Sequence, residues 1–193
     1  MDIKVNKGSK EVHKMYEDLK DLDFIPRLKE EHDDYDILAI NDGEKKKSMS
    51  KEMLISLSEA LGRIRAKGFN YNHNNLTLDN LLFDGNSLSA IIGWDNLTIK
   101  EGIDDLLYLM DNYLDLRGEF TPEEYTLDLI ITMVMHYDKY KDDLDLGYEM
   151  YWYFINKMNG LDKFSSLYEE YNKKLEFVIK YKPYLDELHE EEI

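Results

Sequence analysis

The sequence contains no cysteine among its 193 residues. It therefore has no disulfide framework, no cysteine-based zinc site, no haem attachment and no thiol nucleophile. No apolar run approaches the ~20 residues needed to cross a bilayer, and residues 1–10 lack the apolar stretch of a secretory signal. Together these absences predict a cytoplasmic protein with no membrane contact.

Proline and glycine are also scarce, at 3 and 10 residues. No linker rich in glycine, serine or proline divides the chain, and the sequence has no internal repeat. Hydrophobic residues make up 43% of the chain and aromatic residues 12%, which suffices for a sizeable core. The length predicts one domain, or one lobe of something larger.

Basic residues are fewer than acidic residues. The chain carries 24 Lys and Arg against 41 Asp and Glu, a formal net charge of -17, which argues against binding to nucleic acid. The imbalance is concentrated between residues 101 and 150, which hold 3 basic and 14 acidic residues. We interpret these acids first as solvated helix faces, and alternatively as a surface that recruits a basic partner.

Hydrophobic residues recur at helical spacing through most of the chain, which predicts a mainly α protein with a small β component. Ser9 and Thr121 are the expected N-caps of two helices, with a capping box from Thr121 to Glu124, and Gly68 is an expected stop. The predicted helices span 9–22, 50–66, a stretch from 104 onward, a helix beginning after Thr121, 146–158 and 164–181, before an acidic tail expected to fray.

Two segments predict β structure. Residues 35–40 are apolar enough for a short strand. Two apolar runs, 81–83 and 88–92, flank the turn at 84–86 and predict a β-hairpin. Because the loop before this hairpin carries a cluster of Asn residues, we place the candidate chemistry in 73–95.

The loop and hairpin carry a spaced motif. Residues 73–80 read HNNLTLDN, and residues 90–95 read AIIGWD. This pattern resembles the protein-kinase-like family of aminoglycoside phosphotransferases and choline kinases, including the branch of bacterial spore-coat kinase-like proteins. Their catalytic loop reads HGDxxxxN and precedes a hairpin that ends in IDW or IDF.

The resemblance implies a fold and a set of site positions. His73 corresponds to a loop-bracing His, Asn75 to the catalytic Asp, Asn80 to a metal-binding Asn, and Gly93 to a metal-binding Asp. Residues 48–193 would form the large helical lobe, with the degenerate catalytic loop and hairpin at 73–95. Residues 1–47 would be a remnant of the small lobe, made of one helix and the hinge strand.

The departures from the family pattern imply that the site is degenerate. An amide at Asn75 has no useful basicity near neutral pH, and Gly93 offers no ligand to a metal. Eight residues before Ser9 cannot form the family's first three strands, so the phosphate-pairing Lys that would meet Glu11 is missing. We therefore expect no intact catalytic residue and no cofactor. Asp79, Asn80 and Asp95 are weak candidates for a metal site.

Ordinary structural roles account for several of these residues. We expect His73 to be a satisfied loop histidine and Trp94 to lie in the core. Asp104 and Asp105 precede a helix and are expected to cap it. The aromatic stretch 148–154 is expected to be mostly core, although part of it, or of 35–40, could form an exposed apolar patch.

Three functions remain open from the sequence. The first is a catalytically inactive kinase-like protein, or pseudokinase, that acts in binding, scaffolding or regulation. The second is an ATP-dependent small-molecule phosphotransferase completed by another chain. The third is a structural homo-oligomer, because strand 35–40 has lost its sheet neighbours and needs another chain, a second copy or residues 1–8 as a partner.

Overall fold

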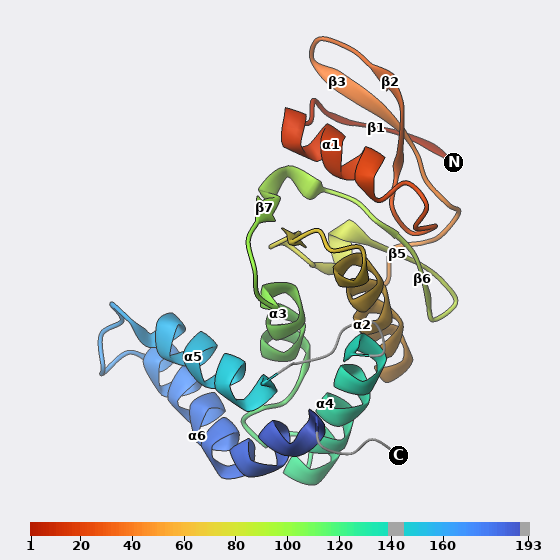
Figure 1. The fold of residues 1–193 in the computed structure, drawn as a ribbon. Helices are drawn as coiled ribbons and strands as arrows, with labels where there is room; N and C mark the ends of the chain where they lie inside the picture. The colour runs from red at the N-terminus through yellow and green to blue at the C-terminus, as the bar shows by residue number, and fades with distance from the viewer. Residues whose placement is uncertain (139–144, 190–193) are drawn as a thin grey trace.

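The computed structural model describes residues 1–138 and 145–189. It confirms a mainly helical protein with small β-sheets. A three-stranded sheet and the first helix form the N-terminal end of the molecule, and a pair of antiparallel helices forms an arm at the other end (Figure 1). The helices are α1 (Lys10–Asp18), α2 (Lys51–Ala66), α3 (Asp104–Tyr113), α4 (Glu123–Asp138), α5 (Leu146–Met158) and α6 (Ser166–Asp186).

Several helices begin where a short polar side chain satisfies a free backbone N–H group. The Ser9 hydroxyl accepts from Val12 N, as predicted, and the same arrangement occurs at Ser50. The prediction for α4 is wrong by one residue. The helix starts at Glu123 rather than after Thr121, because the Asp115 carboxylate binds Thr121 N and fixes the preceding turn.

The N-terminal sheet differs most from the sequence prediction. Strand β3 (Tyr35–Ala39) lies in the middle, with β1 (Asp2–Asn6) and β2 (Arg27–Glu31) antiparallel on either side. The expectation that 35–40 is an unpaired edge is therefore wrong. Of the three partners considered for it, the N-terminal segment is the one observed, and β2 supplies a second.

The remaining strands form two small ladders. The predicted hairpin is confirmed as β5 (Leu81–Asp84) paired with β6 (Ser87–Ile91). A shorter pair joins β4 (Tyr71–Asn72) to β7 (Thr98–Ile99), so the two ends of the motif segment lie side by side. Three short 3₁₀ helices complete the described elements: Leu78–Asn80, Trp94–Asn96 and Glu187–His189.

One hydrophobic core connects these elements. It runs from α1 through α2 and the hairpin to α3, α4, α5 and α6. Its largest fully buried side chains are Phe83, Trp94 and Phe154, so the prediction that Trp94 lies in the core is confirmed. None of the helices in the described part of the chain is both long and apolar enough to cross a membrane.

Candidate functional site

A cleft of the described structure lies beside the motif segment. It has a volume of about 630 Å³. Strands β1 and β3 and helix α1 line one side, and the segments 79–80 and 92–95 line the other. The structure thus brings the predicted residues Asp79, Asn80, Gly93 and Asp95 to a single cleft.

His73 braces the loop, as predicted, and does not reach the cleft. The side chain is fully buried and stacks edge-on against Trp94. Its Nε2 donates to Ile92 O at 2.8 Å, so Nδ1 is free to accept from Asn75 N at 3.2 Å. Burial lowers the pKa of His73 to about 4. The neutral ring therefore ties the loop to the strand that follows it.

Asp105 holds the same loop from the other side. Its carboxylate accepts from His73 N at 2.6 Å and from Asn74 N at 2.8 Å. Burial raises the pKa of Asp105 to about 6, although these two N–H groups oppose the shift. The predicted capping role is wrong. Helix α3 begins without a side-chain cap, and the neighbouring Asp104 pairs with Lys100 instead.

A left-handed residue turns the loop between these two anchors. Asn74 has φ +60°, a conformation that Asn tolerates better than most residues. Its side-chain amide donates to Asn72 O, Asn96 O and Thr98 Oγ1 at 2.8–3.0 Å. The amide therefore joins both arms of the β4–β7 ladder and fixes the direction in which Asn75 leaves the turn.

Asn80 and Gly93 meet on the floor of the cleft. The Asn80 amide donates to Asn75 O at 2.9 Å. Gly93 has φ +74°, and a Cβ atom built there would lie 2.5 Å from Asn80 Oδ1. A side chain at position 93 would therefore strain the backbone and displace the Asn80 amide.

The weak metal candidates do not form a ligand set. Asp79 is 91% exposed and lies 3.8 Å from Lys45 Nζ. Asp95 is also exposed. Among residues 1–138 and 145–189, no three His, Cys, Asp or Glu side chains group as metal ligands do. Asn80 would contribute a neutral oxygen where Mg²⁺ prefers carboxylates.

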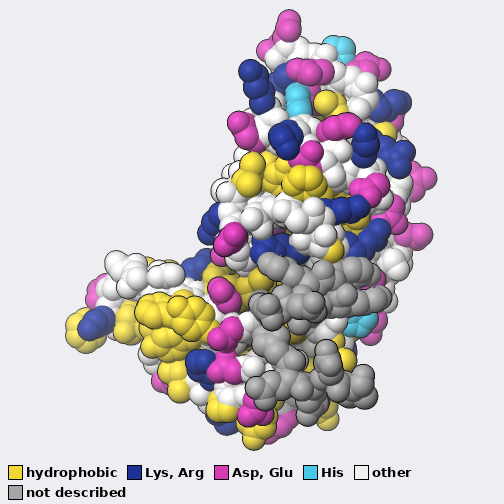
Figure 2. Space-filling view, in the orientation of Figure 1, with side chains coloured by type: hydrophobic (Ala, Val, Ile, Leu, Met, Phe, Trp, Pro, Cys, Tyr) yellow, Lys and Arg dark blue, Asp and Glu magenta, His cyan; other side chains and the backbone are white. Residues whose placement is uncertain are grey.

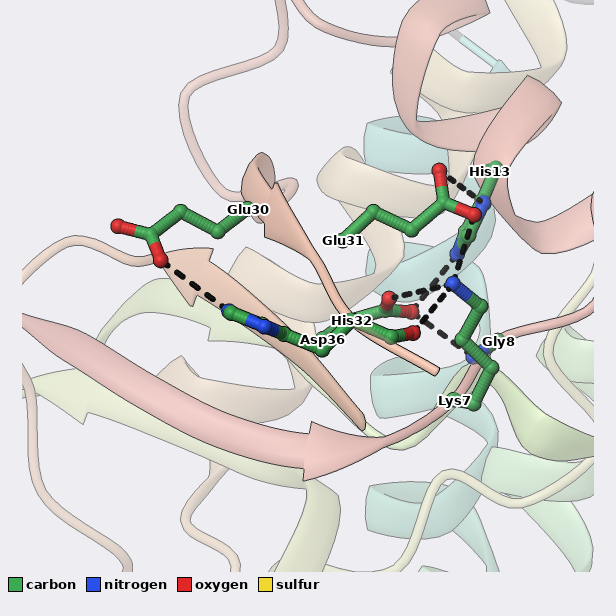
Figure 3. Close-up of polar contacts among 7 residues, drawn as sticks. All are labelled: Lys7, Gly8, His13, Glu30, Glu31, His32 and Asp36. Atoms are coloured by element: carbon green, nitrogen blue, oxygen red, sulfur yellow. Dashed lines mark hydrogen bonds and ion pairs between the residues drawn. The ribbon is translucent and has the colours of Figure 1, made fainter. Parts of the chain in front are cut away.

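Sequence reasoning missed a polar cluster (Figure 3), of which Gly8 and Asp36 line the cleft. Asp36 of β3 is 1% exposed, and its Oδ2 accepts from Gly8 N at 2.8 Å and from His13 Nε2 at 2.7 Å. Lys7 Nζ donates to Glu31 Oε1 at 2.6 Å and lies 3.7 Å from Asp36 Oδ1. The cluster joins β1, α1, β2 and β3.

The charges in this cluster compensate one another. Burial alone would raise the pKa of Asp36, but the Gly8 N–H, His13 and Lys7 hold it below its ordinary value. Hydrogen bonding to Glu31 raises the pKa of Lys7. The sequence signal for the burial of Asp36 was weak. Residues of a strand alternate between its two faces, and a single Asp in an apolar strand is expected on the exposed face.

Two more cleft residues escaped the sequence analysis. Lys4 of β1 places its Nζ 3.7 Å from the centre of the Tyr35 ring. Tyr16 of α1 is 5% exposed and lines the cleft. Tyr16 belongs to the buried face of α1, where an aromatic residue predicts core packing rather than a binding site. Glu11, in contrast, interacts with its own backbone N–H and with Ser9, as expected for a first-turn Glu.

The aromatic stretch at 148–154 is divided between core and surface. Met150 and Phe154 are buried, whereas Tyr148 and Trp152 are about half exposed. Figure 2 shows hydrophobic side chains gathered over the α5–α6 arm. The prediction of mostly core is thus confirmed for one face of α5, and the exposed alternative holds for the other. The last part of the acidic tail, 190–193, lies outside the described residues.

The comparisons with known proteins give a similarity in structure and none in sequence. No protein-family model matches the chain, and no curated protein matches it in sequence. Among solved structures, the complex of gentamicin with APH(2")-IIa, an aminoglycoside phosphotransferase, is similar at 12% sequence identity and a TM-score of 0.48. The alignment covers 95% of this chain and 84% of that chain.

Proposed function

We propose that this chain is a kinase-like protein that does not transfer phosphate and acts by binding a partner. The order of elements from α2 through the loop, the hairpin and α3 supports this proposal, as does a cleft between that loop and a small sheet. In-line phosphoryl transfer needs metal ions on the phosphates, a group that cradles them and a carboxylate near the acceptor hydroxyl.

The packing of Gly93 against Asn80 carries the proposal. The motif resemblance places a metal-binding Asp at position 93, where φ is +74° and a Cβ atom would lie 2.5 Å from Asn80 Oδ1. The amide at Asn75 adds to this deficit, because it cannot take up the proton of an acceptor hydroxyl. Restoring a carboxylate at position 93 would therefore strain the backbone and displace the Asn80 side chain from its present position.

A thermal-shift assay with Mg²⁺-ATP tests this function. A nucleotide bound at 100 times its dissociation constant stabilises a protein by about 2.7 kcal/mol. We expect no shift at millimolar Mg²⁺-ATP, with an active phosphotransferase as the positive control. A clear shift accompanied by phosphate transfer to any small hydroxylated acceptor would overturn the proposal and favour the phosphotransferase alternative.

The double variant Asn75→Asp with Gly93→Asp extends the test. We expect it to gain no phosphotransfer and to be less stable than the single variant Asn75→Asp, because a side chain at position 93 meets Asn80 and a left-handed backbone. Urea unfolding of both variants gives the stability difference. Equal stability of the two would show that the loop accepts a side chain at 93, and the steric reason would then be wrong.

A further inference from the structure

We propose that the cleft binds a basic segment of a partner protein, with an Arg or Lys side chain held near the carboxylates of Asp34 and Asp95. This inference rests on the proposed function and names the chemistry of the partner. The cleft is lined by four Asp and two Lys side chains, and by the rings of Tyr16, Tyr35 and Trp94.

The two lysines of the cleft are already engaged. Lys4 Nζ lies 3.7 Å from the centre of the Tyr35 ring, and Lys45 Nζ lies 3.8 Å from Asp79. Asp34 and Asp95 form no hydrogen bond or ion pair with any described residue through their side chains. Lys4 keeps its positive charge in this contact, but the cleft still has four Asp against two Lys side chains, so its net charge is negative, which disfavours a nucleotide phosphate and favours a cation.

One buried polar atom in the cleft lacks a hydrogen-bond partner among the described residues. Asp36 Oδ1 belongs to a carboxylate that is 1% exposed, and it accepts no hydrogen bond, although Lys7 Nζ lies 3.7 Å away. The Tyr16 side chain is 5% exposed and lines the same cleft. Burial, and then the charges of Asp95 and Asp36, raise the pKa of Tyr16, so its hydroxyl is neutral and lies near both acids. A ligand with an N–H donor would satisfy Asp36 Oδ1.

The aromatic rings give the cleft a preference for guanidinium groups. A planar guanidinium stacks on aromatic faces and donates several hydrogen bonds to carboxylates. Lys4 already covers one face of the Tyr35 ring, so an incoming guanidinium would have to displace Lys4 to stack on that face. With a volume of about 630 Å³, the cleft has room for more than one side chain of an extended peptide.

Isothermal titration calorimetry in 150 mM NaCl tests the inference with a blocked hexapeptide of alternating glycine and arginine. The test variant is Asp34→Asn with Asp95→Asn. The control variant, Glu124→Gln with Asp128→Asn, loses the same charge from exposed positions on α4 whose side chains form no hydrogen bond or ion pair with a described residue. We expect the test variant to bind about tenfold more weakly than wild type and the control to differ less than twofold.

If the peptide is attracted only by the net charge of -17, both variants will lose peptide affinity equally. That result overturns the inference. Absence of peptide binding also overturns it while leaving the proposed function intact, because that function depends on the Mg²⁺-ATP assay. The variant Tyr16→Phe removes one hydroxyl and no charge. We expect it to weaken peptide binding several-fold without lowering stability, and unchanged binding would count against the proposed geometry.

Discussion

At position 73 the imidazole ring is neutral because both nitrogens are already used. Nε2 donates to Ile92 O and Nδ1 accepts from Asn75 N. A proton added at Nδ1 would abolish the second hydrogen bond and place a charge in the core. The pKa of His73 is lowered by burial to about 4 in the folded state, against 6.5 when exposed. The stability that His73 contributes is therefore complete above pH 6.5 and is lost as the pH falls through 4.

The variant His73→Gln tests this dependence. Glutamine keeps a donor for Ile92 O but does not titrate. We expect the free energy of unfolding of the wild type to lose up to about 3 kcal/mol from this residue between pH 6.5 and 4, a loss absent from the variant. Urea unfolding at pH 7, 5.5 and 4 gives the comparison. A constant difference between the two proteins over this range would contradict it.

Asp105 has the opposite dependence. Burial raises its pKa to about 6 in the folded state, above the value of 3.8 in the unfolded chain. The stability that Asp105 contributes is therefore full below pH 3.8 and is lost as the pH rises through 6. The loop thus contains two groups whose pH effects partly cancel. His73→Gln removes one of them and should reveal the other as stability that increases toward acidic pH.

The hydrogen bonds of Asp105 give a second prediction at the residue scale. In Asp105→Asn, the side-chain oxygen can accept from only one of the two backbone N–H groups. The side-chain NH₂ then faces the other backbone N–H group, which leaves two donors opposed. We expect a loss of about 2 kcal/mol in unfolding free energy at pH 7. Asp104→Asn is the matched control, since Asp104 forms a partly exposed pair with Lys100 and should cost less than about 1 kcal/mol. Similar losses in both variants would refute the anchoring role.

The sequence predicted some of these residues and not others. The spacing of the motif placed Asn80 and Gly93 together at one cleft and His73 as a buried brace of the loop. It did not reveal Asp105, because an Asp at a helix start fits a cap equally well. It also missed Asp36 and Tyr16, whose roles depend on which elements pack across from them. Contacts between distant segments are not visible in local residue patterns.

At the scale of elements, local sequence patterns predicted α2 but not β2. Helix α2 was predicted over its full length because its apolar stripe and the Gly68 stop are local signals. The strand β2 reads RLKEE and has no apolar alternation. It is extended because β3 offers it a partner, and a strand of that composition is typical of a protected sheet edge.

The helical end is held together by a buried ion pair. Lys174 of α6 is 6% exposed, and its Nζ donates to Asp111 Oδ1 at 2.6 Å and to Asp111 O at 3.1 Å. Tyr153 of α5 donates to the other carboxylate oxygen at 3.1 Å. Burial alone would lower the pKa of Lys174, but the hydrogen bonds to Asp111 and Glu170 raise it. Three helices thus meet at one carboxylate.

Lys174→Met should loosen this junction. The substitution leaves Asp111 buried without its main partner, which costs about 3–5 kcal/mol. Lys173→Met is the control, because Lys173 is exposed and 3.6 Å from Glu119 and Glu169, and we expect it to cost less than about 1 kcal/mol. Urea unfolding measures both. A loss as small as the control's would mean that water or Lys157 replaces the lost partner.

At the scale of the whole molecule, the excess of negative charge opposes folding. A net charge of -17 on 193 residues repels itself more in the folded than in the unfolded state. The exposed ion pairs offset little of this, because each one contributes less than about 1 kcal/mol. Salt screens both effects, and we expect screening of the long-range repulsion to dominate because it involves many more charge pairs.

Thermal unfolding in NaCl therefore provides the last prediction. Raising the ionic strength from 0.01 to 0.15 M shortens the Debye length from about 30 to about 8 Å. We expect the unfolding free energy to rise by about 1 kcal/mol, which corresponds to about 3 °C in Tm. The variant Glu124→Gln with Asp128→Asn should start at a higher Tm and gain less from salt, because the acidic region 101–150 then carries two fewer charges. A Tm that falls with salt in both proteins would show that attractive ion pairs outweigh the repulsion. The surface acids would then stabilise the fold through ion pairs, and they would not be free to bind a basic partner.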